Sequence, residues 1–241
     1  MEDLICKIAT FPQNQILEIG TGKGQFIPTL KKLAPHYGKI IAVDPNEAFI
    51  FHAKKIFAQD GSVEFWVMDP NHTSFEDHSF DIIAMSNVLH HLPPHNQVFQ
   101  ELKRLLKPEG LVIVVELYCD GAQSEQQHTH ILQHHFRAEV DSRKGIFHDF
   151  TFQRQKIIDM LLKNGLEILN TEDYNDEERM NSRNGEFYDD VVNGITKTIG
   201  LAETFPFKHA YVERGNEILQ RIKEVGFMMP TQLVAIAQFR D

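Results

Sequence analysis

The first half of the chain alternates short apolar runs with segments whose apolar residues recur every three to four positions. Such alternation predicts parallel strands joined by helices. Strands are expected at 15–19, 39–43, 63–67, 80–85 and 111–117, and helices at 25–33, 46–59 and 95–106. We expect Gly61 to cap the second helix, and Pro108 with Gly110 to end the third. This half therefore predicts an α/β fold on a parallel sheet.

The pattern changes after residue 118. Residues 119–150 are polar and rich in His and Gln, and much of 176–230 follows a helical period. A helix at 152–163, a strand at 166–171 and a final strand at 233–239 are expected around them. Because both irregular stretches follow strands, we interpret them as helical cap insertions in a single domain of residues 1–241.

Composition and charge narrow the class of protein. The chain has 241 residues, 42% of them hydrophobic and 24% charged, as is typical of a soluble globular enzyme. The net charge of −10 argues against non-specific binding of nucleic-acid phosphates. The N-terminus lacks the pattern of a signal peptide, and no apolar run is long enough to span a bilayer. We therefore expect a cytoplasmic protein without a nucleic-acid or membrane partner, and its oligomeric state stays open.

The first predicted strand runs into a glycine loop, Glu18-Ile19-Gly20-Thr21-Gly22-Lys23-Gly24. Glycines in a strand–loop–helix turn let the backbone and its N–H groups approach a ligand closely. The spacing is GxGxG, whereas dinucleotide-binding folds use GxGxxG for a pyrophosphate. A carboxylate before the loop also suits a cationic amine better than a diphosphate. The loop therefore disfavours a nicotinamide-dependent oxidoreductase.

Acidic residues follow the second and third predicted strands. Asp44 can accept both hydroxyls of a ribose, although it can also serve only as a charge at a helix N-terminus. Asp69 can accept from an adenine amine, or can simply form a turn beside Pro70. Asp81, inside the fourth strand, is expected to cap or orient neighbouring parts of the chain and not to take part in catalysis.

Several motifs occur together in one order: Glu18–Gly24, Asp44, Asp69, Ser79-Phe80-Asp81, Leu89-His90-His91-Leu92 and Leu105-Leu106-Lys107-Pro108-Glu109-Gly110. In these motifs the chain resembles the class I S-adenosylmethionine-dependent methyltransferases. It is most similar to the small-molecule branch that includes the ubiquinone/menaquinone-biosynthesis methyltransferases. The resemblance covers roughly residues 12–118 strongly.

This resemblance implies a Rossmann-like sheet of seven strands, mostly parallel, with the last strand reversed. It implies that S-adenosylmethionine is the cofactor. The glycine loop would approach its methionine part, Glu18 its amino group, Asp44 its ribose, and Asp69 its adenine between Pro45 and Met68. Ser86 and Asn87 would lie near the sulfonium. The implied cofactor-binding residues are Glu18, Gly20, Thr21, Gly22, Gly24, Asp44, Pro45, Met68, Asp69, Ser86 and Asn87.

Histidines gather between residues 128 and 148. His148, flanked by Phe147 and Phe150, is our candidate for a catalytic base, since an aromatic environment would keep the imidazole neutral. His130 and His134 share a helix face and can hold a transition metal, with Glu139, Asp141 or Asp149 as a further ligand. The pattern also fits a solvated helix face. We favour an acceptor pocket without a metal, and His90 and His91 as packing residues.

Methyl transfer from a sulfonium is an in-line displacement that the protein promotes mainly by alignment and exclusion of water. The sequence therefore predicts an enzyme that methylates a small-molecule acceptor in this way. The alternative is a non-catalytic protein of the same fold that binds S-adenosylmethionine or a partner. Nucleic-acid methylation is unsupported, because Ser86-Asn87-Val88-Leu89 stands where an Asn-Pro-Pro-Tyr-like motif would follow the fourth strand.

Overall fold

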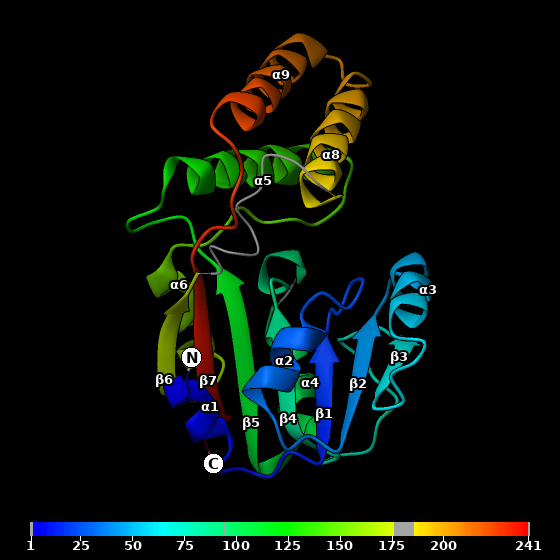
Figure 1. Ribbon diagram of the computed structural model, residues 1–241, viewed down its shortest axis with the longest axis vertical. Coiled ribbons are helices and arrows are strands. Elements are labelled where there is room, and N and C mark those ends of the chain that lie inside the picture. Colours follow the sequence, from blue (N-terminus) through cyan, green and yellow to red (C-terminus); the bar gives the residue numbers. More distant parts are fainter. Residues whose placement is uncertain (1, 94, 176–185, 241) are drawn as a thin grey trace. The chain divides into compact units, whose positions relative to one another are not determined.

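Seven strands form one sheet in the computed structural model, which describes residues 2–93, 95–175 and 186–240. The strands are β1 (Gln15–Ile19), β2 (Lys39–Asp44), β3 (Val63–Val67), β4 (Phe80–Ser86), β5 (Leu106–Leu117), β6 (Leu166–Tyr174) and β7 (Gln232–Phe239). Their order is β3-β2-β1-β4-β5-β7-β6 (Figure 1). Strands β1 to β5 pair in parallel and the last strand is antiparallel. This confirms the predicted Rossmann-like methyltransferase sheet.

Helices connect the strands. They are α1 (Glu2–Ile8), α2 (Ile27–Leu33), α3 (Glu47–Ile56), the 3₁₀ helix η1 (Leu89–His91), α4 (His95–Leu105), α5 (Glu125–Arg143), α6 (Arg154–Lys163), α8 (Glu186–Ala202) and α9 (Lys208–Glu224). Local sequence explains where two of them begin. The Asn46 side chain accepts from two backbone N–H groups of α3. Ser124 and Gln127 form a capping box at the start of α5. No helix among the described residues is long and apolar enough to cross a membrane.

Two predicted boundaries were wrong. Helix α3 ends at Ile56, so Gly61 does not cap it; the Asp60 N–H donates to the Phe57 carbonyl and turns the chain earlier. Pro108 and Gly110 lie within β5, which begins at Leu106. Its pairing with β4 shifts register after Leu106, and this irregularity accommodates the proline.

The described chain divides into two compact units. Unit 1 comprises residues 1–116, 157–172 and 233–241, and unit 2 comprises 117–156 and 173–232. The predicted insertions 119–150 and 176–230 fall in unit 2, although residues 176–185 lie outside the described residues. Unit 2 has its own apolar core, formed by α5, α8 and α9. Its members include Phe136, Val140, Ile195, Ile199, Ala202, Tyr211, Ile218, Ile222 and Phe227.

The arrangement of unit 1 brings two strand ends together. Strands β1 and β4 are neighbours, with Ile19 opposite Met85. The glycine loop after β1 and the segment after β4 therefore leave the sheet side by side at its carboxyl edge. In open α/β sheets this edge is where ligands bind.

Candidate functional site

The glycine loop forms a cradle that only small residues fit. Gly20, Gly22 and Gly24 all have positive φ angles. A Cβ on Gly20 would lie 2.3 Å from Cγ2 of Val88, in the segment after β4. The N–H groups of Gly20 and Thr21 both donate to the Val43 carbonyl, which fixes the loop against β2. The glycines therefore let the loop pack closely against neighbouring side chains, since a Cβ at Gly24 would likewise lie 2.6 Å from the Phe57 ring.

Asp44 is held in place by the backbone around it. One carboxylate oxygen accepts from the Gly22 N–H at 2.9 Å and the other from the Asn46 N–H at 2.8 Å. Each oxygen has two lone pairs, so both retain capacity to accept a hydroxyl. The Met68 N–H donates to the Asp44 carbonyl at 3.1 Å. The structure thus brings Asp44 close to both the glycine loop and Met68, as the proposed cofactor site requires.

Glu18 is buried directly beneath the loop, with 1% of its surface exposed. Its carboxylate accepts from the Thr21 hydroxyl at 2.6 Å. Burial raises the pKa of Glu18 to about 7; the Thr21 hydrogen bond opposes this increase and the charge of Asp44 adds to it. A buried carboxylate with a raised pKa favours a nearby cation. Glu18 therefore fits the ammonium group that the sequence predicts for it.

Two other predicted acids have structural partners. Asp69 is exposed, and its Oδ1 accepts from the backbone and the side-chain amide of Asn71, both at 2.9 Å. This is an Asx turn, so the adenine contact of Asp69 stays a prediction. Asp81 is buried and accepts from the Gln15 N–H and from Lys107. Asp81 thereby ties β1, β4 and β5 together, consistent with its expected structural role.

The segment after β4 carries a histidine–carboxylate pair. The left-handed Asn87 turns the chain, and its N–H donates to the Val115 carbonyl. Helix η1 then directs Nδ1 of His90 to Oε1 of Glu116, at 2.7 Å. The Leu89 N–H donates to the other Glu116 oxygen at 3.0 Å. His90 is 3% exposed and Glu116 1%, so both side chains are buried.

Sequence reasoning missed this pair. The available signal was Glu116 itself, since it ends a run of buried apolar residues in β5. A carboxylate in such a strand needs a partner, because burying an unpaired charge costs several kcal/mol.

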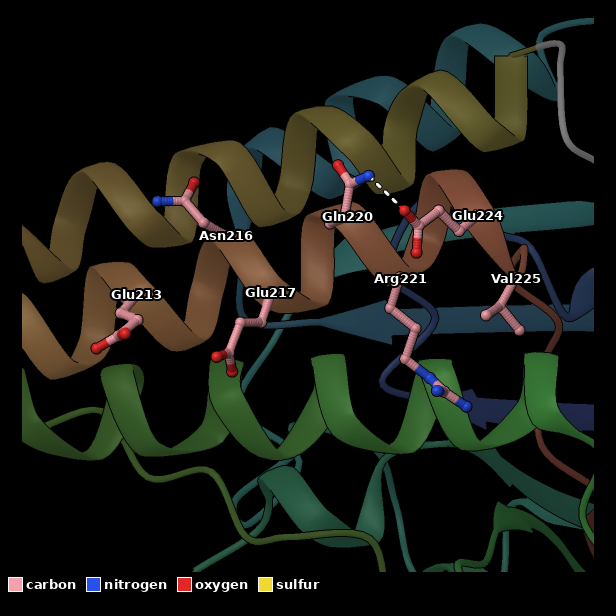
Figure 2. Close-up of a pocket in the computed structure, with 7 residues that line it drawn as sticks. All are labelled: Glu213, Asn216, Glu217, Gln220, Arg221, Glu224 and Val225. Carbon is pink, nitrogen blue, oxygen red and sulfur yellow. Dashed lines mark hydrogen bonds between the residues drawn. The ribbon is translucent and has the colours of Figure 1, made fainter.

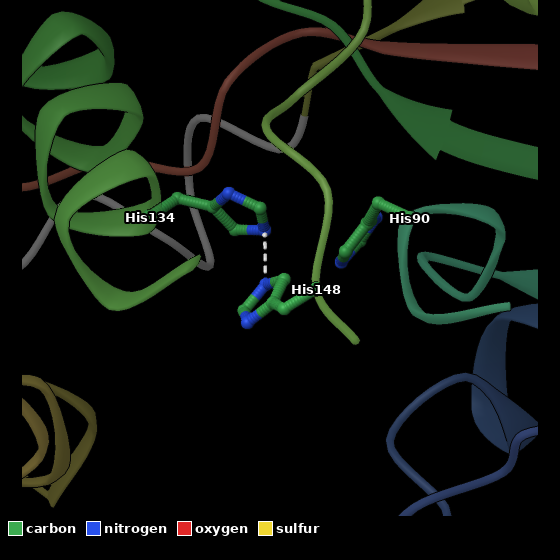
Figure 3. Close-up of side chains that lie close together, drawn as sticks. All are labelled: His90, His134 and His148. Atoms are coloured by element: carbon green, nitrogen blue, oxygen red, sulfur yellow. Dashed lines mark hydrogen bonds between the residues drawn. The ribbon is translucent and has the colours of Figure 1, made fainter. Parts of the chain in front are cut away.

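Two histidines of unit 2 contact each other, and one of them also contacts a carboxylate. His148 Nδ1 lies 2.8 Å from Oδ2 of Asp141, and His148 Nε2 lies 3.2 Å from Nε2 of His134 (Figure 3). Burial raises the pKa of the Asp141 carboxyl, but His148 and Arg137 lower it further, so the net pKa lies below the usual value.

The aromatic surroundings expected for His148 stay a prediction. Phe150 stacks on His135, with ring centroids 4.6 Å apart, and Phe147 is exposed. His130 stacks on Phe227 and thus has a different ring partner from His134. His130 and His134 are both buried on α5, which agrees with the shared helix face predicted from their spacing, and His134 also lies against His148.

Unit 2 also carries an open pocket along α9 (Figure 2). Its volume is about 640 Å³, and its lining is mostly charged or amide side chains. The lining residues are Glu213, Asn216, Glu217, Gln220, Arg221, Glu224 and Val225. None of the predicted site residues lines it. Arg221 pairs with Glu125 and donates to Thr129, so this arginine joins α9 to α5.

Residues 17–114 match the family described as "Methyltransferase domain". This segment thus resembles a methyltransferase domain. It extends from β1 into β5 and contains the glycine loop, Asp44 and His90. The matched segment therefore contains every cofactor-binding residue predicted from the sequence, whereas Glu116 lies just beyond it.

Individual proteins are similar over this domain or over the fold. A highly reducing polyketide synthase of Pyrenophora dematioidea is 34% identical over 119 residues, which are 45% of this chain and 5% of that protein. A polyketide synthase-nonribosomal peptide synthetase of Phaeosphaeria nodorum is 30% identical over 124 residues, 48% of this chain and 3% of that protein. The chain thus corresponds to a small part of these curated relatives.

Solved structures share the whole fold at low identity. A SAM-dependent methyltransferase from Methanosarcina mazei has a TM-score of 0.58 at 19% identity, covering 98% of this chain and 96% of that one. The [4+2]-cyclase SpnF has a TM-score of 0.59 at 19% identity, covering 98% and 78%. The fold therefore accommodates more than one chemistry, and function must be argued from the site.

Proposed function

We propose that the protein transfers a methyl group from S-adenosylmethionine to a small-molecule acceptor, and that His90 removes a proton from that acceptor. The observation that carries this proposal is the buried His90–Glu116 pair. His90 lies two residues after Val88, which contacts the cradle at Gly20. A base at this position is close to the loop that is predicted to approach the methyl donor.

The residues around the glycine loop fit the cofactor. Gly20, Gly22 and Gly24 give the loop the left-handed turns of a tight strand–helix connection, Glu18 offers a carboxylate to the ammonium, and Asp44 offers two anchored oxygens to a ribose. When bound, S-adenosylmethionine would supply an activated methyl group on a sulfonium. We further propose that Pro45 and Met68 flank the adenine, that Thr21 supports Glu18, and that Ser86 and Asn87 lie near the sulfonium.

The pair makes His90 a suitable base. An ionised Glu116 accepts a hydrogen bond from Nδ1–H, so the neutral imidazole carries its lone pair on Nε2. Glu116 then stabilises the imidazolium that forms once Nε2 has taken a proton. The Leu89 N–H fixes the second oxygen of Glu116 and so holds its orientation.

His148 is the base predicted from sequence, and we propose His90 in its place. Both ring nitrogens of His148 have partners, Asp141 and His134. For His148 to accept a proton from an acceptor at Nε2, His134 would have to move. We prefer His90 because it engages its carboxylate through Nδ1 and follows Val88, the neighbour of Gly20 in the glycine loop.

A base in the site indicates which chemical class of acceptor the enzyme would methylate. A neutral amine or a thioether attacks with an existing lone pair, whereas a C–H or O–H acid first loses a proton. The named relatives are polyketide synthases. We therefore propose an acceptor with an acidic C–H next to a carbonyl. His90 would take the proton of that C–H bond, and the electron pair left on carbon would accept the methyl group that bound S-adenosylmethionine would supply.

We propose that the insertions influence which acceptor is used. Residues 119–150 follow β5 and residues 176–230 follow β6, so both leave the carboxyl ends of strands. Loops at that edge determine specificity in open α/β folds. The narrower resemblance to ubiquinone/menaquinone-biosynthesis methyltransferases stays a prediction, as does the non-catalytic alternative.

One experiment tests this function in two stages. Calorimetry should detect binding of S-adenosylmethionine and of S-adenosylhomocysteine, and much weaker binding of NAD. Transfer of labelled methyl should then be measured with a 3-oxoacyl thioester, and with an amine of similar size as control. We expect product from the thioester only. Absence of S-adenosylmethionine binding would refute the function, whereas binding without transfer to either compound favours a non-catalytic protein.

A further inference from the structure

Unit 2 contains two buried histidines whose nitrogens face each other. His134 comes from α5, and His148 lies on the segment that follows this helix. The two Nε2 atoms are 3.2 Å apart, and the ring planes are nearly perpendicular at 89° (Figure 3). Both side chains are buried, at 8% and 7% exposed. Neither residue belongs to the cofactor site or to the proposed base.

The separation of the two nitrogens has a simple geometric meaning. Two imidazole ligands at about 2.0 Å from a tetrahedral metal ion stand about 3.3 Å apart. Hydrogen bonds donated by N–H to oxygen span about 2.7–3.2 Å, so a hydrogen bond between the rings is also compatible with this separation. The observed 3.2 Å is thus compatible with two corners of a tetrahedron, and the orienting carboxylate favours the metal.

Asp141 supplies the second element of such a site. Its Oδ2 lies 2.8 Å from Nδ1 of His148, so Nδ1 carries the proton and the lone pair of Nε2 points toward His134. A metal-binding histidine commonly donates its other N–H to a carboxylate in this way, which fixes the ring and raises its basicity. Arg137 contacts the same oxygen of Asp141 at 2.9 Å and holds the carboxylate in position.

The geometry points to a transition-metal site in unit 2, in which His134 and His148 bind one divalent ion through their Nε2 atoms. Paired imidazoles favour Zn²⁺, Co²⁺, Ni²⁺ or Cu²⁺ over Mg²⁺ and Ca²⁺, which prefer oxygen ligands. The two histidines would occupy two coordination positions of the ion. Other ligands would occupy the rest, as in metal sites that keep a coordination position open. This inference goes beyond the proposed methyl transfer, and metal binding tests it separately.

The test is a titration of the full, untagged chain with Co²⁺ and then with Zn²⁺, followed by visible absorption and calorimetry. We expect one ion per chain, a tetrahedral Co²⁺ absorption band, and loss of that band when Zn²⁺ is added. His134→Ala and His148→Ala should weaken binding by at least 10-fold. Asp141→Asn should weaken it by about 10-fold or more, because it disturbs only the orienting carboxylate.

His128→Ala is the matched control, since this exposed histidine lies on the same helix and should leave the affinity unchanged. If either histidine variant fails to fold, Zn²⁺ should still raise the Tm of the wild type and of His128→Ala, as expected for a ligand of the native state. The inference is overturned if the wild type binds less than one Co²⁺ per chain, or if His128→Ala weakens binding as much as His148→Ala. In that case His134 and His148 are joined only by a hydrogen bond.

Discussion

Nδ1 of His90 lies 2.7 Å from Oε1 of Glu116, and both side chains are almost fully buried. The two residues come from different segments, η1 after β4 and the end of β5, which are adjacent because β4 and β5 pair in parallel. A carboxylate that holds a buried imidazole in one tautomer is an arrangement suited to general-base catalysis.

Replacement of either partner should therefore slow methyl transfer without weakening cofactor binding. We expect His90→Ala and Glu116→Gln each to lower kcat by at least about 100-fold, because general-base catalysis contributes roughly 10²–10⁴-fold. The Kd for S-adenosylhomocysteine should stay close to that of the wild type. Steady-state kinetics and calorimetry measure the two quantities separately.

His148→Ala distinguishes the two candidate bases. If His90 is the base, the single-turnover rate constant of methyl transfer should be far higher in His148→Ala than in His90→Ala. Full activity of His90→Ala together with a large loss in His148→Ala would instead support the base predicted from sequence.

Asp44→Ala should weaken binding of S-adenosylmethionine by about 10- to 150-fold. Hydrogen bonds from ribose hydroxyls to a charged acceptor contribute about 1.5–3 kcal/mol to the binding free energy. Losing this contribution raises the Kd by about 10- to 150-fold. Glu47→Ala is a suitable control, because Glu47 is an exposed carboxylate in the first turn of α3. An unchanged Kd for Asp44→Ala in calorimetry would contradict the ribose contact.

Glu18 should make cofactor binding depend on pH. Its pKa is about 7 in the cofactor-free protein, because it is buried, whereas the cofactor's ammonium would favour its ionised form. Below pH 7, binding then requires the release of one proton, so affinity should rise about tenfold per pH unit up to pH 7 and level off above it. Glu18→Gln should abolish this slope, measured by calorimetry between pH 5.5 and 8.5 in roughly half-unit steps.

The same group should affect the stability of the cofactor-free protein. Its pKa is raised from 4.5 in the unfolded chain to about 7, so the native state binds more protons between these values. Stability from this group is therefore full below pH 4.5 and decreases by about 3 kcal/mol as pH rises to 7. Urea unfolding of Glu18→Gln should lack this decrease; a parallel profile in both proteins would contradict the raised pKa.

Gly215 should be required for packing within unit 2. A Cβ at this position of α9 would lie 2.5 Å from Cγ1 of Ile199 and 3.0 Å from the ring of Phe136. Gly215→Ala should lower the free energy of unfolding by about 1–3 kcal/mol, since overpacking outweighs the gain in helix propensity. Gly194→Ala on α8 is the control, because a Cβ there meets nothing within 4 Å. Thermal unfolding should show a loss for Gly215→Ala and no loss for Gly194→Ala.

The sequence by itself determined the alternation of strands and helices, the glycine loop and Asp44. Each depends on local pattern: apolar runs predict buried strands, and a strand that ends in Gly20-Thr21-Gly22 predicts a loop open to a ligand. Helix and strand ends were less predictable. Gly61 was expected to cap a helix that instead ends at Ile56, because hydrogen bonds of Asp60 turn the chain first.

Only the tertiary structure decided which polar groups meet. Glu116 is 26 positions from His90, and Asp141 and His134 approach His148 through the fold of the chain after α5. Sequence pattern reports which face of an element is apolar, but a contact between distant side chains depends on strand order, register and loop path. The carboxylate of Asp141 and the imidazole of His134 beside His148 therefore became visible only in the folded chain.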